Sequence, residues 1–323
     1  MKMRLVIAGL WLLVAAVSVF GQVKAPPETR NAALRYWQAF AELKDPPANQ
    51  GIQVEMEKVL SGDAPWDEVK LGGVVAANEI PLGIMHRATK LPDCDWGVEY
   101  SRGPEASIAF VPRAHVLARL NMLQGIRQMA KGQPQAAVET WLAGIRFAQD
   151  LTRGGSLIFS LTAKSVLQQE MHTLTAEAKQ RRLNSTQKKQ LYTAVNALPE
   201  DGFDWELAWE LDSAGADVFF EEMQRSQNPK GVFESLMGKL APKGCIPPSA
   251  QQVMLYHEYM NDVAAALRLP PPATKQRLVE LDGKANGICE AIRLAIPCSQ
   301  CVNDARVEII GARKDLLDAL GVR

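Results

Sequence analysis

The chain has 323 residues, of which 36 are basic and 36 are acidic, so its formal net charge is zero. This balance gives no indication of the strongly basic surface through which many proteins bind nucleic acids. A chain of this length can bury a large core, either as one extended domain or as two ordinary ones.

The first 21 residues have the organisation of a secretory signal peptide. Lys2 and Arg4 precede an apolar run over 5–20, and Gly21 ends a small-x-small cleavage site. An uncleaved membrane anchor is less favoured, because a helix that spans a bilayer needs about 20 apolar residues. We therefore predict a cleaved signal peptide over 1–21 and an exported mature chain, periplasmic or secreted, with no stable membrane span.

The cysteine distribution predicts a disulfide-stapled C-terminal region. Four of the five cysteines lie in the last quarter of the chain, and an exported protein meets an oxidising environment. We expect disulfides among these four and a free thiol at Cys94. Spacing leaves three pairings open, and a four-cysteine zinc site is the less favoured alternative. The disulfide candidates are Cys245, Cys289, Cys298 and Cys301.

Beyond the leader, apolar side chains recur at steps of three and four residues, which indicates amphipathic helices. Prolines end the first helix after Asp45, and Gly72-Gly73 interrupts the third. Ser156 and Asn184 are predicted helix caps, the second with Gln187 three residues on. The predicted helical stretches cover 28–43, 52–60, 66–88, 106–132, 133–151, 156–182, a stretch from 184, then 204–223, 250–268, a stretch from 274, and 305–320.

Alternating β-branched strands bounded by tight turns are nearly absent from the sequence. We therefore predict an all-α protein, an array or bundle of about ten antiparallel helices joined by turns that Pro and Gly mark. The N-terminal helical region is expected over 22–200 and the C-terminal one over 201–323. One continuous domain that includes both is the alternative.

The stretch from Ala118 to Leu151 resembles one unit of a tetratricopeptide repeat. Three polar side chains depart from that family, which has large apolar groups where Asn121, Gln124 and Gln128 stand. Such arrays need about three repeats to be stable, so one degenerate unit predicts a TPR-like helical hairpin and not a solenoid. The matching residues are Gly125, Gly132, Ala137, Trp141 and Gly144.

A fainter resemblance covers more of the chain. "NAALRYWQAF" near the start, "CDWG" at 94–97 and the hairpin around 132–137 occur in the order found in a group of uncharacterised, exported, all-helical proteins of acidobacterial and planctomycete type. The resemblance implies export and an all-helical fold. It implies no catalytic residues.

The decapeptide "LPDCDWGVEY" at 91–100 holds three acidic residues, a cysteine and a tryptophan. Its carboxylates, with the nearby His86, could bind a hard cation, but their spacing does not match the twelve-residue calcium loop. We favour a structural corner in which Trp96 and Cys94 pack into the core. Asp93 and Asp95 would then cap the turn and the neighbouring helix end.

Other motifs give no cofactor or metal site. In "HEYMN" Asn261 stands where a zinc protease helix has its second histidine, so a mononuclear zinc site at His257 is disfavoured. The C-x-x-C pair at 298–301 has no strands around it and no following histidine, which disfavours a thioredoxin-like or haem role. We predict no cofactor.

Two functional hypotheses remain. The first is an exported helical binding or scaffold protein whose partner is a protein, a peptide or a cell-envelope component, and not a nucleic acid. The second is an exported hydrolase with a site near His86, Asp93, Asp95 and His115. Convergence of these four side chains in one pocket would favour the hydrolase.

Overall fold

The computed structural model describes residues 29–105, 110–180, 182–237, 248–285, 287–293 and 296–322. The predicted signal peptide over 1–21 and Cys245 lie outside these residues. Contacts between residues gather Asn31–Arg323 into one compact unit. All statements below concern this unit.

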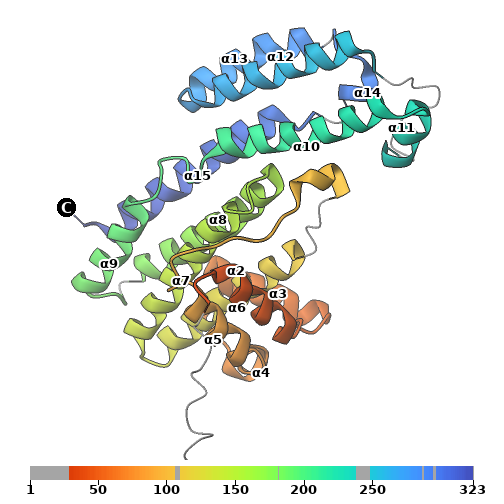
Figure 1. The fold of residues 1–323 in the computed structure, drawn as a ribbon. Coiled ribbons are helices and arrows are strands. Elements are labelled where there is room, and N and C mark those ends of the chain that lie inside the picture. The colour runs from red at the N-terminus through yellow and green to blue at the C-terminus, as the bar shows by residue number, and fades with distance from the viewer. Residues whose placement is uncertain are drawn as a thin grey trace, which may run out of the picture. The chain divides into compact units, whose positions relative to one another are not determined.

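The regular secondary structure of the described residues is entirely helical, as the sequence predicts, and no strand occurs among them (Figure 1). An isolated bridge joins Asn31 to Asp93. The helices are α2 (Ala32–Glu42), α3 (Gln50–Ser61), α4 (Glu68–Ala76), α5 (Glu79–Ala88), η1 (Tyr100–Glu105), α6 (Val111–Ala130), α7 (Pro134–Thr152), α8 (Leu157–Lys179), α9 (Ser185–Asn196), α10 (Trp205–Arg225), α11 (Pro229–Met237), α12 (Ala250–Leu267), α13 (Pro271–Ala285), α14 (Glu290–Arg293) and α15 (Ser299–Leu320).

Side-chain caps explain where the N-terminal helices begin. Asn31, Asn49 and Asp67 each accept a hydrogen bond from a backbone N–H of the first turn of α2, α3 and α4. The third predicted stretch divides into α4 and α5 at Asn78, not at Gly72-Gly73. The Asn78 side chain is buried and bonds both the N–H and the C=O of Lys44 (2.9 and 3.1 Å), which joins this break to the loop after α2.

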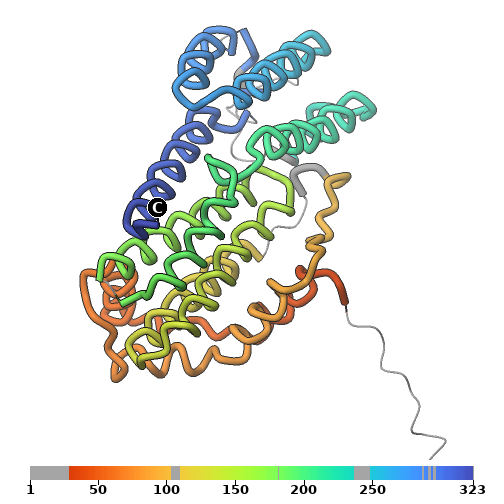
Figure 2. Tube along the Cα trace, turned by 90° about the vertical axis from the view of Figure 1, so that its left-hand side faces the viewer, coloured from red at the N-terminus to blue at the C-terminus, as the bar shows by residue number. Residues whose placement is uncertain are grey.

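The predicted pair over 106–151 forms α6 and α7, joined by a turn in which Gly132 has φ 72°. These helices pack on each other and on α8, and α5 contacts both of them. Their inner faces are therefore core. The trace in Figure 2 shows the hairpin alongside α8, in agreement with these contacts.

One predicted capping side chain and one predicted helix boundary need correction. Ser156 lies at the N-cap of α8, but its side chain makes no capping bond; Leu157 N donates instead to Asp212 Oδ1 of α10 (3.1 Å). Pro271 begins α13 three residues earlier than expected, because proline is tolerated in the first turn of a helix. The capping box of Asn184 and Gln187 is confirmed at the start of α9.

The C-terminal helices form two groups. α15 packs along α8 and also contacts α9 and α13, so the last helix closes the core. Helices α10, α12 and α13 pack in sequence, and both views place them at the end of the unit opposite α2–α5. The short helices α11 and α14 escaped the periodicity argument because they have too few turns to show a pattern.

The disulfide prediction holds for one pair. Cys298 and Cys301 are bonded, with their Cα atoms 5.2 Å apart, and they close only the first turn of α15. Cys94 is a buried free thiol, as expected for the odd cysteine. Cys289, predicted to take part in a disulfide, is also a free thiol, so that prediction is wrong for it. A disulfide with so short a loop constrains little of the chain, so it stabilises the start of α15 more than the C-terminal region.

Candidate functional site

The 93–97 loop is a structural corner that fixes the start of α2. The Asn31 side chain accepts a hydrogen bond from Asp95 N and donates one to Asp95 O (both 2.8 Å). Ala32 N donates to Asp93 O (2.7 Å). Gly97 has φ 66°, a conformation that favours glycine, and its N–H donates to Asp95 Oδ1 (2.9 Å). The carboxylate of Asp95 therefore stabilises a turn.

Trp96 packs the corner loop against a cluster of aromatic side chains. Its ring stacks on Phe110 with 4.3 Å between centroids and on Tyr36 with 5.5 Å, and Phe110 in turn stacks on Phe159. Trp96 is 5% exposed and Cys94 is 7% exposed. The packing roles predicted for both side chains are present.

Asp150, near the end of α7, anchors this cluster. Its backbone carbonyl accepts hydrogen bonds from Trp96 Nε1 (2.7 Å) and Cys94 Sγ (3.6 Å), and its Oδ2 accepts one from Tyr36 OH (2.8 Å). Arg146 Nε lies 3.2 Å from Oδ1. Burial raises the pKa of this carboxyl, and the bond from Tyr36 opposes that rise. Sequence reasoning missed Asp150, since an acid near the end of a helix usually faces solvent.

A second polar group lies inside the hairpin. His86 Nε2 donates to Asn121 Oδ1 (2.8 Å), because Asn121 Nδ2 is already the donor to Thr140 O (2.9 Å). Thr140 Oγ1 donates to Gln128 Oε1 (2.8 Å). Burial lowers the pKa of His86, so its ring is neutral in this network. Asn121 and Gln128 are two of the polar departures from the repeat pattern. Both lie on α6 and bond Thr140 of α7, and Asn121 also bonds His86 of α5.

Glu170 of α8 is the most unusual side chain in this core. It is 0% exposed, and neither of its oxygens has a hydrogen-bond partner among the described residues. A Cβ atom placed on Gly144 would lie 2.6 Å from Glu170 Oε2 and 2.9 Å from Asn121 Nδ2, so all three groups meet at one point. Burial raises the pKa of Glu170 well above its usual value. The site therefore favours the neutral form of this carboxyl over its charged form.

The four sequence-predicted site residues lie at three places with different partners. Asp93 and Asp95 belong to the corner beside Asn31, and His86 belongs to the Asn121 network. His115 is half-buried on α6, where burial and the nearby Arg119 lower its pKa. Within the described part of the chain, no group of three His, Cys, Asp or Glu side chains could hold a metal ion.

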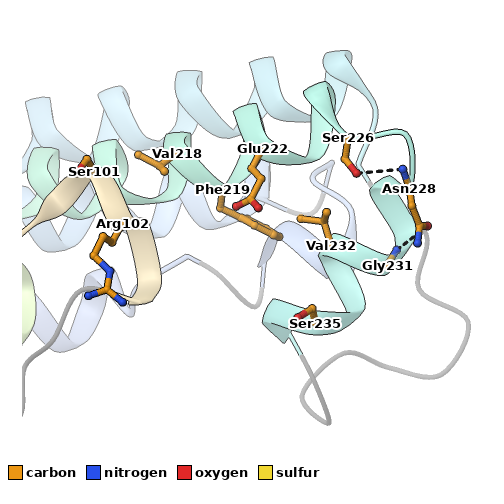
Figure 3. Close-up of a pocket in the computed structure, with 10 residues that line it drawn as sticks. All are labelled: Ser101, Arg102, Val218, Phe219, Glu222, Ser226, Asn228, Gly231, Val232 and Ser235. Carbon is orange, nitrogen blue, oxygen red and sulfur yellow. Dashed lines mark hydrogen bonds between the residues drawn. The ribbon is translucent and has the colours of Figure 1, made fainter.

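A cleft of about 520 Å³ opens between η1, α10 and α11 (Figure 3). Phe219 is buried and lines the cleft beside the half-buried Val218 and Val232. Two side chains of opposite charge line the same cleft, Arg102 from η1 and Glu222 from α10. The remaining lining is polar: Ser101, Ser226, Asn228, Gly231 and Ser235.

Two hydrogen bonds hold the turn between α10 and α11, which forms one side of the cleft. Asn228 N donates to Ser226 Oγ (3.0 Å), and Gly231 N donates to Asn228 Oδ1 (3.0 Å), so the turn and the start of α11 are held together. Sequence reasoning missed this cleft, because its residues come from segments far apart in the chain. No local sequence pattern indicates that these residues lie close together in the fold.

None of the known protein families, curated proteins or solved structures compared with this chain matches it. Across the described residues, no helix combines the length and the apolar character needed to cross a membrane.

Proposed function

We propose that this protein is an exported helical binding protein whose ligand occupies the cleft between η1, α10 and α11. The observation that carries the proposal is the cleft itself, with an apolar floor, opposite charges and a polar rim. Ligand sites of this size, about 300 to 1,000 Å³, commonly combine an apolar lining with a few polar groups that orient the ligand.

A second cleft of about 520 Å³ is a weaker candidate. It lies over Pro270–Pro272, and both of its arginines already have partners within the protein. Arg306 donates to Asp201 Oδ2, Thr274 Oγ1 and Leu269 O, and Arg268 pairs with Glu206. A ligand would have to displace these bonds, whereas Glu222 has no side-chain partner among the described residues.

Two features support the proposed export. The sequence of 1–21 has the organisation of a signal peptide, and Cys298 and Cys301 form a disulfide, which is rare in reducing compartments. The buried Cys94 does not conflict with export, because burial and Asp150 raise the pKa of its thiol to about 12 and keep it unreactive.

Ligand-induced melting of the mature protein tests the proposed site. The panel contains amino acids, short peptides, sugars and nucleotides, each at high concentration. A ligand that binds only the folded state stabilises it by about 2.7 kcal/mol at one hundred times its Kd, which raises Tm.

Two tryptophan substitutions locate the binding. Ser101→Trp places a large ring at the exposed rim of the cleft, and Ser185→Trp places one at an exposed position on α9 as a control. We expect the Tm shift to vanish in the first variant and to persist in the second. A shift that survives Ser101→Trp would place the site elsewhere, and no shift with any member of the panel would count against the binding function.

A further inference from the structure

The cleft presents one cation and one anion to a ligand. Glu222 is exposed on α10, and its carboxylate has no ion-pair or hydrogen-bond partner among the described residues. Arg102 is 54% exposed, and its contact with Glu99 is long, at 3.8 Å between Arg102 Nη1 and Glu99 Oε2. Such exposed pairs contribute little, so the guanidinium is available to a ligand.

The two charges come from different elements and face one cleft. Figure 3 shows the Arg102 side chain leaving η1 and the Glu222 side chain leaving α10 above the ring of Phe219. Phe219 and Glu222 are three residues apart on one helix, which places them on the same face. A ligand over Phe219 would therefore meet an apolar surface beside a carboxylate, with a guanidinium farther along the cleft.

We propose that the ligand is a short peptide with a free amino terminus and a free carboxyl terminus, a choice that rests on the binding function proposed above. Glu222 accepts the peptide ammonium group, Arg102 binds the carboxylate, and an apolar peptide side chain packs on Phe219 and Val232. Guanidinium and carboxylate groups suit each other because their hydrogen bonds are charge-assisted and can form in pairs.

Other ligand classes fit this arrangement less well. A polyanion would meet the unpaired carboxylate of Glu222, which repels it. A neutral sugar could hydrogen-bond to both groups but would bring a counter-charge to neither. A free amino acid shares the ends of a peptide but would fill a smaller part of a cleft of about 520 Å³.

Isothermal titration with three probes tests the ligand class. The probes are leucylphenylalanine, its N-acetyl derivative, which lacks the ammonium group, and its C-terminal amide, which lacks the carboxylate. We expect the unmodified dipeptide to bind the wild-type protein, and each modified form to bind about fivefold more weakly or worse, the upper range for a partly exposed ion pair.

Substitutions in the cleft assign each charge to its partner. In Glu222→Gln the dipeptide and its N-acetyl derivative should bind with equal affinity, because the carboxylate that separates them is gone. In Arg102→Gln the dipeptide and its amide should become equal. Glu221→Gln is the matched control: it lies on the same helix, pairs with Arg225 and does not line the cleft, so it should keep the wild-type pattern.

The outcomes separate this inference from the proposed function. If all three probes bind equally and Ser101→Trp abolishes their binding, the cleft binds ligands but the assignment of the charges is overturned. If no probe binds while another member of the melting panel does, the peptide class is wrong and the binding function stands. Binding that is unchanged in Ser101→Trp overturns both.

Discussion

Glu170 and Glu222 lie on long helices of the same compact unit, and their surroundings are opposite. Glu170 is enclosed by α6, α7 and α8, and its carboxyl oxygens have no partner among the described residues. Glu222 is exposed at the edge of a cleft. A buried carboxyl without a partner is stable only when neutral, whereas an exposed one keeps its charge for a ligand. The same residue type therefore serves the core in one region and recognition in the other.

Packing explains why one region is closed and the other open. Small residues let α6, α7 and α8 approach closely: the ring of Trp141 fills the space beside Gly125, and Glu170 fills the space beside Gly144. Between α10 and α11 the chain turns through Ser226 and Asn228, and η1 contacts α10 but leaves a gap beside it. If this contrast is correct, substitutions in the core should alter stability and those in the cleft should alter binding.

The largest effect is expected from Trp96→Ala in the corner. Removing a buried tryptophan from a packed cluster costs about 3 to 5 kcal/mol in the free energy of unfolding, and here it also removes the hydrogen bond to Asp150 O. Trp37→Ala is the control, because Trp37 belongs to the same cluster but is 40% exposed. Chemical denaturation should show a loss for Trp96→Ala at least twice that for Trp37→Ala. Equal losses would show that the corner does not hold the core.

Close packing at the hairpin predicts opposite effects for two glycine substitutions. In Gly144→Ala the new methyl group would meet Glu170 Oε2 at 2.6 Å, so we expect a destabilisation of about 1 to 3 kcal/mol. Gly73 lies inside α4 with no atom within 4 Å of its potential Cβ, so Gly73→Ala should stabilise by about 0.5 to 1 kcal/mol. Denaturant midpoints measure both changes. The same sign for both would contradict the packing described.

The sequence predicts this contrast only in part. The amphipathic stripes and the capping box at Asn184 depend on neighbours within a few turns, so their patterns are visible in the sequence. The corner around Trp96 was predicted from the composition of its loop, although its partners Asn31 and Asp150 lie more than fifty residues away in the chain. Glu170 also left a trace: it stands three residues after Leu167 and four before Leu174, on the apolar stripe of the predicted helix over 156–182. This position on the stripe is the one sequence feature that indicates burial of Glu170.

No sequence pattern of this kind indicates the cleft. Helices α6 to α9 lie between Arg102 of η1 and Glu222 of α10 in the chain, and only the tertiary fold brings the two residues to one cavity. The hydrolase hypothesis rested on closeness in sequence of His86, Asp93 and Asp95. The structure instead places the His86 ring against Asn121, whereas the Asp93 and Asp95 backbones bond the start of α2 and the Asp95 carboxylate accepts a bond from Gly97 N.

Burial of Glu170 predicts a pH dependence of stability. Its folded-state pKa is raised above the unfolded value, so the folded protein holds this proton more tightly, and the stability it provides is lost as pH rises through the folded pKa. Glu170→Gln keeps the shape and removes the titration. We expect its free energy of unfolding relative to wild type to increase by on the order of 1 kcal/mol or more between pH 5 and pH 8.

Other groups titrate in this range, so the comparison of the two proteins is what isolates Glu170. Burial raises the pKa of Asp212 to about 6 and that of Asp150 by an amount common to both proteins, while the lowered pKa of His86 acts in the opposite direction. Urea denaturation at several pH values gives the difference directly. A constant difference in the free energy of unfolding between Glu170→Gln and wild type would show that Glu170 has the same pKa in the folded and unfolded states.

The smallest effect on stability is expected at Glu222. Because its carboxylate is exposed and has no partner among the described residues, Glu222→Gln should change the free energy of unfolding by no more than about 0.5 kcal/mol, the usual range for surface substitutions. Calorimetry on the ligand-free protein measures this change. A loss as large as that of Gly144→Ala would mean that Glu222 supports the fold, and the weaker peptide binding of the variant would then report damage to the cleft. Unchanged stability together with altered peptide selectivity would instead assign the carboxylate to recognition, because the change in selectivity could not then be attributed to damage of the fold.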